Sequence, residues 1–207
     1  MSTVKYYDWS YHQARTRPNK VAVKEVSTGR ETTYGQLEER SCRLASWLQN
    51  KGVKKGDRVA ILIHNCTEVF ELEFACAKIG AIELPLNWRL TKPELEYILN
   101  DSSPEVLIYG SNFADTAKAL TKDCSIKNSL EIDDEDQNNE YEQALKENID
   151  FDIVETTHDD LIMLMYTSGT TGHPKGAMIT HEMQFYNIVN LAGSARVTDK
   201  TVQLIVL

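Results

Sequence analysis

Short runs of apolar residues alternate along the chain with segments in which apolar residues recur every three or four positions. The continuous runs have the length of strands buried in a sheet, and they lie at residues 59–63, 81–86, 106–109 and 161–165. The periodic segments have the spacing of amphipathic helices, and they cover residues 34–51, 65–79, 92–99 and 113–120. Strands that alternate with such helices predict an α/β fold with a largely parallel sheet covered by helices.

Polar residues at the predicted helix starts support this interpretation. In a capping box, the first residue and a Gln or Glu three positions later satisfy each other's free backbone N–H groups. Three predicted helices begin with this spacing, at Thr33–Gln36, Asn65–Glu68 and Thr91–Glu94. The local signals therefore agree with the hydrophobic pattern.

The first part of the chain predicts a hairpin. Residues 5–20 read as a leading helix or an irregular arm that is closed by Pro18. The stretches at 21–23 and 32–34 are rich in β-formers and flank a polar turn at 27–30.

The last part predicts a short strand at 177–179 and a helix capped by Thr180. Residues 202–207 are apolar and β-branched, which is typical of a strand. Because a chain seldom ends inside an apolar strand, we expect residues 1–207 to be an incomplete N-terminal domain of a longer protein.

One segment departs from the alternating pattern. Residues 131–147 contain eight acidic residues and one lysine, so most of the formal net charge of −9 comes from this segment. We interpret it as a solvated connection within the domain, with a short exposed helix at 140–147, and prefer this to a binding role. No basic patch is visible, which argues against a nucleic-acid-binding protein.

Composition fits an ordinary soluble domain, with 42% hydrophobic and 26% charged residues among 207. No apolar run reaches the length of a membrane span, and the polar N-terminus does not resemble a signal peptide. The four cysteines show no C-x-x-C spacing: Cys42, Cys66, Cys76 and Cys124. We therefore expect a reducing, cytoplasmic setting and no metal cluster.

The richest candidate for chemistry is the stretch 166–176, which holds three glycines, four Ser or Thr hydroxyls and one lysine. Glycines let the main chain approach a ligand closely, and backbone amides in such a loop can form an anion-binding concavity. Lys175 adds a mobile positive charge. The composition predicts a phosphate cradle, although a mobile surface loop would use the same residues.

This loop is not one of the two commonest nucleotide-binding loops. A Walker A loop requires G-x-x-x-x-G-K-[ST], whereas here Lys175 follows Gly172 by three positions and is itself followed by Gly176. Nor does the stretch contain G-x-G-x-x-G.

The complete string Y-T-S-G-T-T-G-x-P-K-G resembles the phosphate-loop signature of the acyl-adenylate-forming, or AMP-binding, superfamily. Two more elements of that family are matched in order. Residues 32–37 resemble its T-Y-x-x-L element, and residues 78–87 with 95–99 resemble K-x-G-A-x-x-x-P-L and L-x-Y-I-L. Residues 85–91, P-L-N-W-R-L-T, are most similar to the fatty-acyl and related acyl-CoA ligases.

The resemblance implies that the full-length protein joins a carboxylic acid to coenzyme A with ATP and Mg²⁺, through an acyl-adenylate. It implies that the loop binds the β- and γ-phosphates through Thr167, Ser168, Gly169, Thr170, Thr171, Gly172 and Lys175. It also implies that the acyl-pocket motif, the magnesium-linked Thr-Glu pair and the catalytic lysine of such enzymes lie beyond residue 207. We therefore assign no catalytic and no metal-binding residue within the chain.

The leading hypothesis is the N-terminal portion of a fatty-acid CoA ligase that is inactive alone. The alternatives are another adenylate-forming ligase, of the aryl-acid or peptide-synthetase type, or a non-catalytic nucleotide-binding or interaction module. A homodimer is a further possibility.

For several single residues near these motifs, a structural role is preferred to a chemical one. We expect His173 to be exposed and non-catalytic, His181 to serve the start of a helix, and His64 to pack or cap at a strand end. Trp88 and Arg89 face either a neighbouring domain or channel, or simply the surface.

Overall fold

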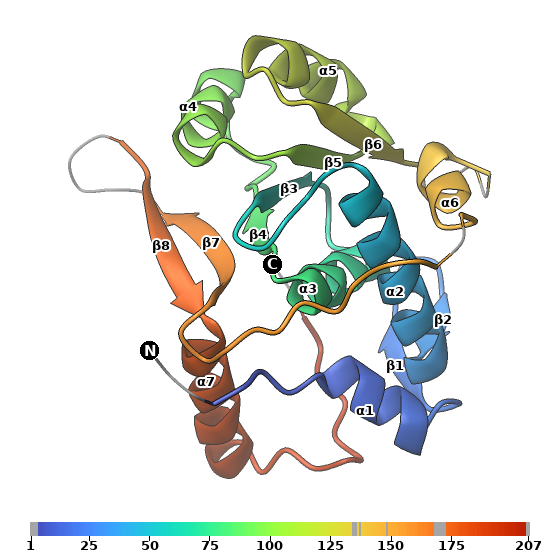
Figure 1. Ribbon diagram of the computed structural model, residues 1–207. Helices are drawn as coiled ribbons and strands as arrows, with labels where there is room; N and C mark the ends of the chain where they lie inside the picture. Colours follow the sequence, from blue (N-terminus) through green and yellow to red (C-terminus); the bar gives the residue numbers. More distant parts are fainter. Residues whose placement is uncertain (1–3, 134–135, 137, 148, 168–172, 206–207) are drawn as a thin grey trace.

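In a computed structural model, the protein forms a six-stranded sheet with helices on both faces (Figure 1). The structure describes residues 4–133, 136, 138–147, 149–167 and 173–205. The strand order is β6-β5-β3-β4-β7-β8, and every neighbouring pair is parallel except β7 with β8. The strands are β3 (Arg58–Leu62), β4 (Ile82–Pro85), β5 (Val106–Gly110), β6 (Asn128–Ile132), β7 (Leu161–Thr167) and β8 (Lys175–Thr180). The predicted α/β fold with a largely parallel sheet is confirmed.

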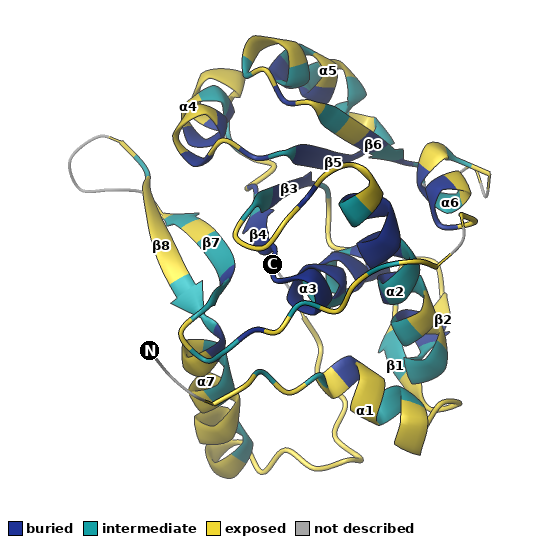
Figure 2. Ribbon diagram, viewed as in Figure 1, coloured by how far each residue is buried: buried dark blue, intermediate teal, exposed yellow. Residues whose placement is uncertain are grey.

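Successive side chains of a strand point to opposite faces of the sheet, and helices cover both faces here. On one face, Val59 and Ile61 of β3 join the core formed with α2 (Tyr34–Asn50) and α3 (Thr67–Ile79). On the other face, Ala60 and Leu62 join the core formed with α4 (Lys92–Ser102) and α5 (Ala114–Asp123). Figure 2 shows the central strands and most of α3 as buried. Burial on both faces explains why this strand is a continuous apolar run.

The remaining elements surround this centre. An antiparallel hairpin of β1 and β2 lies beside α2, as expected. The bounds are α1 (Trp9–Thr16), β1 (Val21–Lys24), β2 (Glu31–Thr33), α4 (Lys92–Ser102), a 3₁₀ turn (Ser111–Phe113), α5 (Ala114–Asp123), α6 (Glu140–Ala144) and α7 (His181–Ser194). No helix of the described residues is both long enough and apolar enough to span a membrane.

Two predicted capping boxes are confirmed. The backbone N–H of Gln36 donates to Oγ1 of Thr33 at 3.3 Å, and the N–H of Thr33 donates to Oε1 of Gln36 at 2.9 Å. The second box is formed by Thr91 with Glu94. Thr180 also caps α7 as predicted, accepting from the N–H of Met183.

The predicted start at Asn65 is wrong. Helix α3 begins at Thr67, and its N-cap residue Cys66 makes no side-chain capping bond. Instead, Oε1 of Glu25, at the hairpin, accepts from the N–H of Thr67 at 3.0 Å and from its hydroxyl at 2.8 Å. A carboxylate distant in sequence caps this helix, so the local spacing at Asn65–Glu68 was misleading.

The acidic segment is more ordered than we predicted. Its first residues belong to β6, an unpredicted strand parallel to β5 in which Leu130 and Ile132 are buried between more exposed neighbours. Its helix α6 is not simply exposed, because Tyr141 is only 1% exposed. The high density of acidic residues obscured the apolar positions that pack on the core.

Ion pairs hold this segment in place. Arg40 of α2 donates to Glu71 of α3 and to Glu142 of α6, each at 2.6 Å. The hydroxyl of Tyr141 donates to Oε2 of Glu71 at 2.7 Å. The segment is therefore docked on the α2–α3 face of the sheet.

Two strand expectations at the end of the chain need correction. Residues 202–205 do not form a strand, and Val202 is 94% exposed. Within 161–165 only Ile162 is buried, because β7 lies near the end of the sheet and pairs there with the exposed strand β8. An apolar run alone does not reveal whether another element covers it.

Candidate functional site

The glycine-rich stretch connects β7 to β8 in an antiparallel hairpin at one end of the sheet (Figure 1). Thr167 and Lys175 are cross-strand partners, so the structure brings together these two predicted phosphate-binding residues. The other five lie outside the described residues: Ser168, Gly169, Thr170, Thr171 and Gly172. Their phosphate-binding role stays a prediction.

The side chains at the two ends of the loop are available to a ligand. Thr167 and Lys175 are both exposed. No carboxylate among the described residues forms an ion pair with Lys175, whereas Lys55, Lys78 and Lys92 each have one. An exposed ammonium group that forms no ion pair within the described part of the chain fits a role as a point charge on phosphate.

Gly176 is required by the packing of the hairpin. It lies opposite Tyr166 in the ladder. A Cβ atom at this position would lie 3.2 Å from Cζ of Tyr166 and 2.9 Å from Cδ1 of Leu164. The absence of a side chain at Gly176 therefore lets the Tyr166 ring lie across β8.

Helix α4 contacts both sides of the hairpin. The Tyr166 hydroxyl donates to Oδ2 of Asp101 at 2.5 Å, and the pKa of Tyr166 is raised by burial and by this carboxylate. The ring of His173 stacks on Tyr97, with centroids 4.9 Å apart and an interplanar angle of 22°. His173 is exposed, as predicted.

The carboxyl end of β7, at Thr167, lies at the edge of the sheet where ligands bind in many α/β proteins. β7 runs parallel to β4, which runs parallel to β3, so their carboxyl ends share one edge. In open α/β sheets, ligands bind outside this edge. The position of the loop thus agrees with a binding role.

An aromatic cluster lies at the same edge. His64 follows β3 and contacts the rings of Trp88 and Phe113, with centroids 4.6 and 5.0 Å apart. The guanidinium of Arg89 lies 4.2 Å from the centroid of Trp88. The sequence did not predict this cluster, although each aromatic residue follows a predicted parallel strand, which is the signal that could have revealed it.

His181 is buried at the first position of α7. It is 3% exposed, its ring contacts Tyr6, and its backbone N–H donates to the carbonyl of Asp160. Burial lowers the pKa of His181 to about 4. These contacts support the predicted role at the start of the helix.

Lys78 of the second family motif also has structural contacts. It is 4% exposed, and its ammonium lies 2.7 Å from a carboxylate oxygen of Asp8 and 2.8 Å from one of Glu38. This lysine therefore joins α3 to α2 and to the N-terminal arm, away from the glycine loop.

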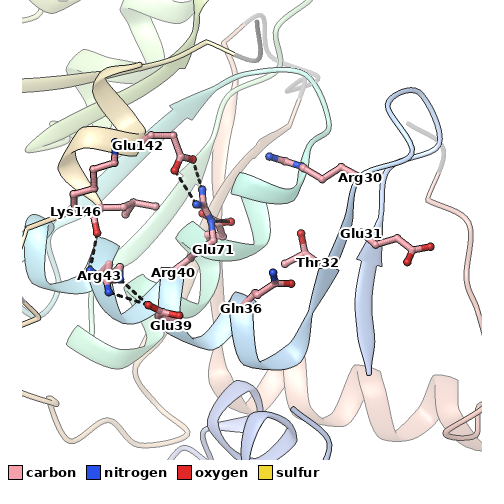
Figure 3. A pocket seen from close by; sticks show the side chains of 11 residues that line it. Arg30, Glu31, Thr32, Gln36, Glu39, Arg40, Arg43, Glu71, Glu142 and Lys146 are labelled. Carbon is pink, nitrogen blue, oxygen red and sulfur yellow. Dashed lines mark hydrogen bonds and ion pairs between the residues drawn. The ribbon is translucent and has the colours of Figure 1, made fainter. Parts of the chain in front are cut away.

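A pocket among the described residues lies beside the acidic segment. It has a volume of about 560 Å³ and is lined by β2, α2, α3 and the α6 region (Figure 3). Its lining includes four cationic side chains and four carboxylates. Figure 3 shows Arg40 reaching Glu142 and Arg43 reaching Glu39, so these charges neutralise one another. The pocket lies where the acidic segment packs against α2 and α3.

The described residues do not contain a group of three or more His, Cys, Asp or Glu side chains that could hold a metal ion.

The largely parallel sheet with helices on both faces, ended by the β7–β8 hairpin, defines an α/β class of protein. A family described as "AMP-binding enzyme" matches residues 10–207, and the chain belongs to this family. The resemblance inferred from the motifs is confirmed.

Two of the most similar relatives are named as a CoA synthase and a CoA ligase. The chain is 39% identical over 183 residues to a feruloyl-CoA synthase of Amycolatopsis, covering 88% of this chain and 35% of the relative. It is 38% identical over 180 residues to the long-chain-fatty-acid–CoA ligase FadD13 of Mycobacterium tuberculosis, covering 86% and 36%. The chain thus spans about a third of the length of these relatives.

The fold is shared with a solved structure that contains bound ATP. ATP-bound MatB from Rhodopseudomonas palustris superposes with a TM-score of 0.78 at 28% identity, covering 91% of this chain and 38% of MatB. The architecture matches that of the N-terminal part of adenylate-forming enzymes.

Proposed function

We propose that this chain is the N-terminal portion of an ATP-dependent carboxylate–CoA ligase that acts on a fatty acid or a similar carboxylic acid. The observation that carries the proposal is the pairing of Thr167 with Lys175 at the carboxyl edge of the sheet. This pairing places the exposed hydroxyl of Thr167 and the exposed ammonium group of Lys175 at the two ends of the glycine loop.

The proposed role of the loop is electrostatic. ATP supplies an activated phosphorus that the substrate carboxylate attacks, and CoA then accepts the acyl group from the adenylate. Thr167, Ser168, Gly169, Thr170, Thr171 and Gly172 hold the β- and γ-phosphates through N–H and hydroxyl groups. Lys175 stabilises the negative charge that gathers on the departing pyrophosphate, since preorganised donors are most effective where charge develops. Mg²⁺ accompanies the phosphates.

The identity of the acid is proposed from the relatives. One relative is named for a fatty acid and another for ferulate, so both classes belong in the assay. Residues 85–91 favour a fatty acid. An aryl acid is the second candidate, because the feruloyl-CoA synthase is slightly more identical.

The test is ATP–pyrophosphate exchange with a panel of fatty and aryl acids, run on the full-length ligase that contains this chain and on residues 1–207 alone. We expect exchange only in the full-length form, because other family site elements lie outside this chain. Turnover by the chain alone above background would contradict its proposed inactivity.

The role of Lys175 is tested in the full-length ligase by Lys175→Ala. Loss of a charge-assisted contact of about 2–3 kcal/mol would slow adenylation by roughly 30- to 150-fold. Acyl-substrate binding should change little. The matched control is Lys122→Ala, since Lys122 is an exposed lysine on α5. Unchanged pre-steady-state adenylation in Lys175→Ala would disprove the phosphate role.

We also propose a cytoplasmic setting and a homodimer. All four cysteines are free, which supports a reducing environment.

The exposed apolar residues Met183, Ile188 and Leu191 of α7 provide a surface on which two copies could associate. Light scattering of the full-length protein measures the assembly, and a monomer at micromolar concentration would exclude the dimer.

A further inference from the structure

Both sides of the glycine loop are attached to a single helix. Tyr166, next to the end of β7, bonds to Asp101 at 2.5 Å. His173, just before β8, stacks on Tyr97 at a centroid distance of 4.9 Å. Tyr97 and Asp101 both belong to α4.

The spacing of Tyr97 and Asp101, the two anchors on α4, explains why both reach the hairpin. Residues four positions apart lie on one face of a helix, about one turn from each other. Tyr97 and Asp101 therefore present a ring and a carboxylate to the hairpin side by side. The ring contacts His173, two residues before β8 begins, and the carboxylate contacts Tyr166 in β7.

The hairpin is shaped to accept these contacts. Tyr166 crosses β8 at Gly176, the position where a Cβ atom would approach its ring to 3.2 Å. Tyr166 also packs against the apolar core on the α4–α5 face. The tyrosine is thus held between that core, β8 and the Asp101 carboxylate.

Helix α4 is itself firmly placed. Leu95, Ile98 and Leu99 are each no more than 2% exposed, and they anchor the helix on the sheet. Its first turn is fixed by the capping box of Thr91 with Glu94. A rigid helix can therefore transmit its position to the hairpin.

We propose that Tyr97 and Asp101 are positioning residues for the phosphate-binding loop, acting through His173 and Tyr166. This inference rests on the proposed function of the loop. A loop that binds phosphate in the transition state works best when its ends are fixed beforehand, because no energy is then spent on ordering it. The two contacts fix Thr167 and Lys175 relative to the sheet.

The test is steady-state kinetics of the full-length ligase that contains this chain. Tyr166→Phe removes one anchor and Tyr97→Ala removes the other. We expect the double variant to raise the KM for ATP about tenfold, the equivalent of one hydrogen bond to a charged group. The KM for the carboxylic acid should stay within about twofold of wild type, which a general loss of structure would not allow.

Two conservative variants test whether the ring stacking and the hydrogen bond themselves are needed. Tyr97→Phe keeps the ring and Asp101→Asn keeps an acceptor, so both should remain near wild type for ATP. Asp101→Ala should match Tyr166→Phe, and combining them should be no worse than either alone. The matched control is Tyr109→Phe, because Tyr109 also donates to a carboxylate, Glu131, at 3.1 Å, but lies on β5 and bonds to β6 instead of joining α4 to the hairpin.

The outcomes distinguish this inference from the function on which it rests. An unchanged KM for ATP in the double variant, with a defective Lys175→Ala variant, overturns the positioning role alone. An equal rise in both KM values also overturns it, since the effect would then be structural. Unchanged ATP kinetics in both the double variant and Lys175→Ala overturn the phosphate role of the loop and this inference together.

Discussion

The hydroxyl of Tyr141 donates a hydrogen bond to Glu71 at 2.7 Å, and the two residues are separated by 70 positions in the chain. This bond joins the acidic segment to α3 in the buried core. Burial and the nearby Glu71 carboxylate raise the pKa of Tyr141, so the phenol remains a donor at neutral pH.

Removal of this hydroxyl should weaken the fold. Tyr141→Phe leaves one oxygen of the buried Glu71 carboxylate without a donor, which we expect to cost about 1–3 kcal/mol of unfolding free energy. Urea unfolding at pH 7 measures the change. A loss below about 0.5 kcal/mol would show that the acidic segment is not held through this bond.

His181 should make stability depend on pH in the acidic range. Burial lowers its pKa from 6.5 to about 4, so the folded state disfavours the proton that the unfolded chain accepts. Its contribution is present above pH 6.5 and is lost as the pH falls towards 4, in total about 3 kcal/mol. We expect the wild type to lose this amount relative to His181→Gln over that interval, measured by urea unfolding at several pH values. If stability depends on pH in the same way in both proteins, the predicted contribution of His181 is refuted.

Glu83 should give a pH dependence of the opposite sign. Glu83 is 1% exposed, and neither of its carboxylate oxygens has a hydrogen-bond partner among the described residues. Burial raises the pKa of Glu83 well above the ordinary value, and the nearby Glu73 carboxylate raises it further. Protonated Glu83 is tolerated at low pH, so stability is lost as the pH rises above the ordinary carboxyl pKa of about 4.3.

Replacement of this carboxylate should therefore stabilise the chain at neutral pH. We expect Glu83→Leu to raise the unfolding free energy by about 1–3 kcal/mol at pH 8 and by less at pH 4.5. Thermal unfolding at the two pH values provides the measurement. A greater gain at pH 4.5 than at pH 8 would contradict the assignment.

Gly176→Ala and Gly193→Ala should have opposite effects. A Cβ at Gly176 meets Leu164 at 2.9 Å, so overpacking should cost about 1–2 kcal/mol. A Cβ at Gly193, within α7, meets nothing within 4 Å, so the better helix propensity of alanine should add about 0.5–1 kcal/mol. Differential scanning calorimetry of both variants tests the pair. Equal effects of the same sign would show that packing at Gly176 does not matter.

The alternation of strands and helices was predictable because it depends on local periods of burial. Val59, Ala60 and Ile61 are apolar in succession because helices cover both faces of β3. The boxes at Thr33 and Thr91 were predictable because each bond spans three residues. The same local reasoning failed at Asn65, where the capping carboxylate comes from Glu25.

The residues of the candidate site were predictable from the sequence, but the contacts that hold them in place were not. The sequence identified Lys175 and the glycine loop from contiguous residues. It did not reveal that Asp101 holds Tyr166, because these residues are 65 positions apart. Nor did it reveal β6, whose apolar positions are interrupted by polar and acidic ones.

By itself, the sequence determined the parallel α/β plan, the main helix starts and the loop with its family signature. These features depend on residues close together in the chain, where steric and hydrogen-bonding preferences act locally. Only the tertiary structure decided that the acidic segment docks on Arg40 and that α4 holds the hairpin at Tyr166. Those contacts form only when the sheet brings distant segments together, so their energy is a property of the fold and not of any single stretch.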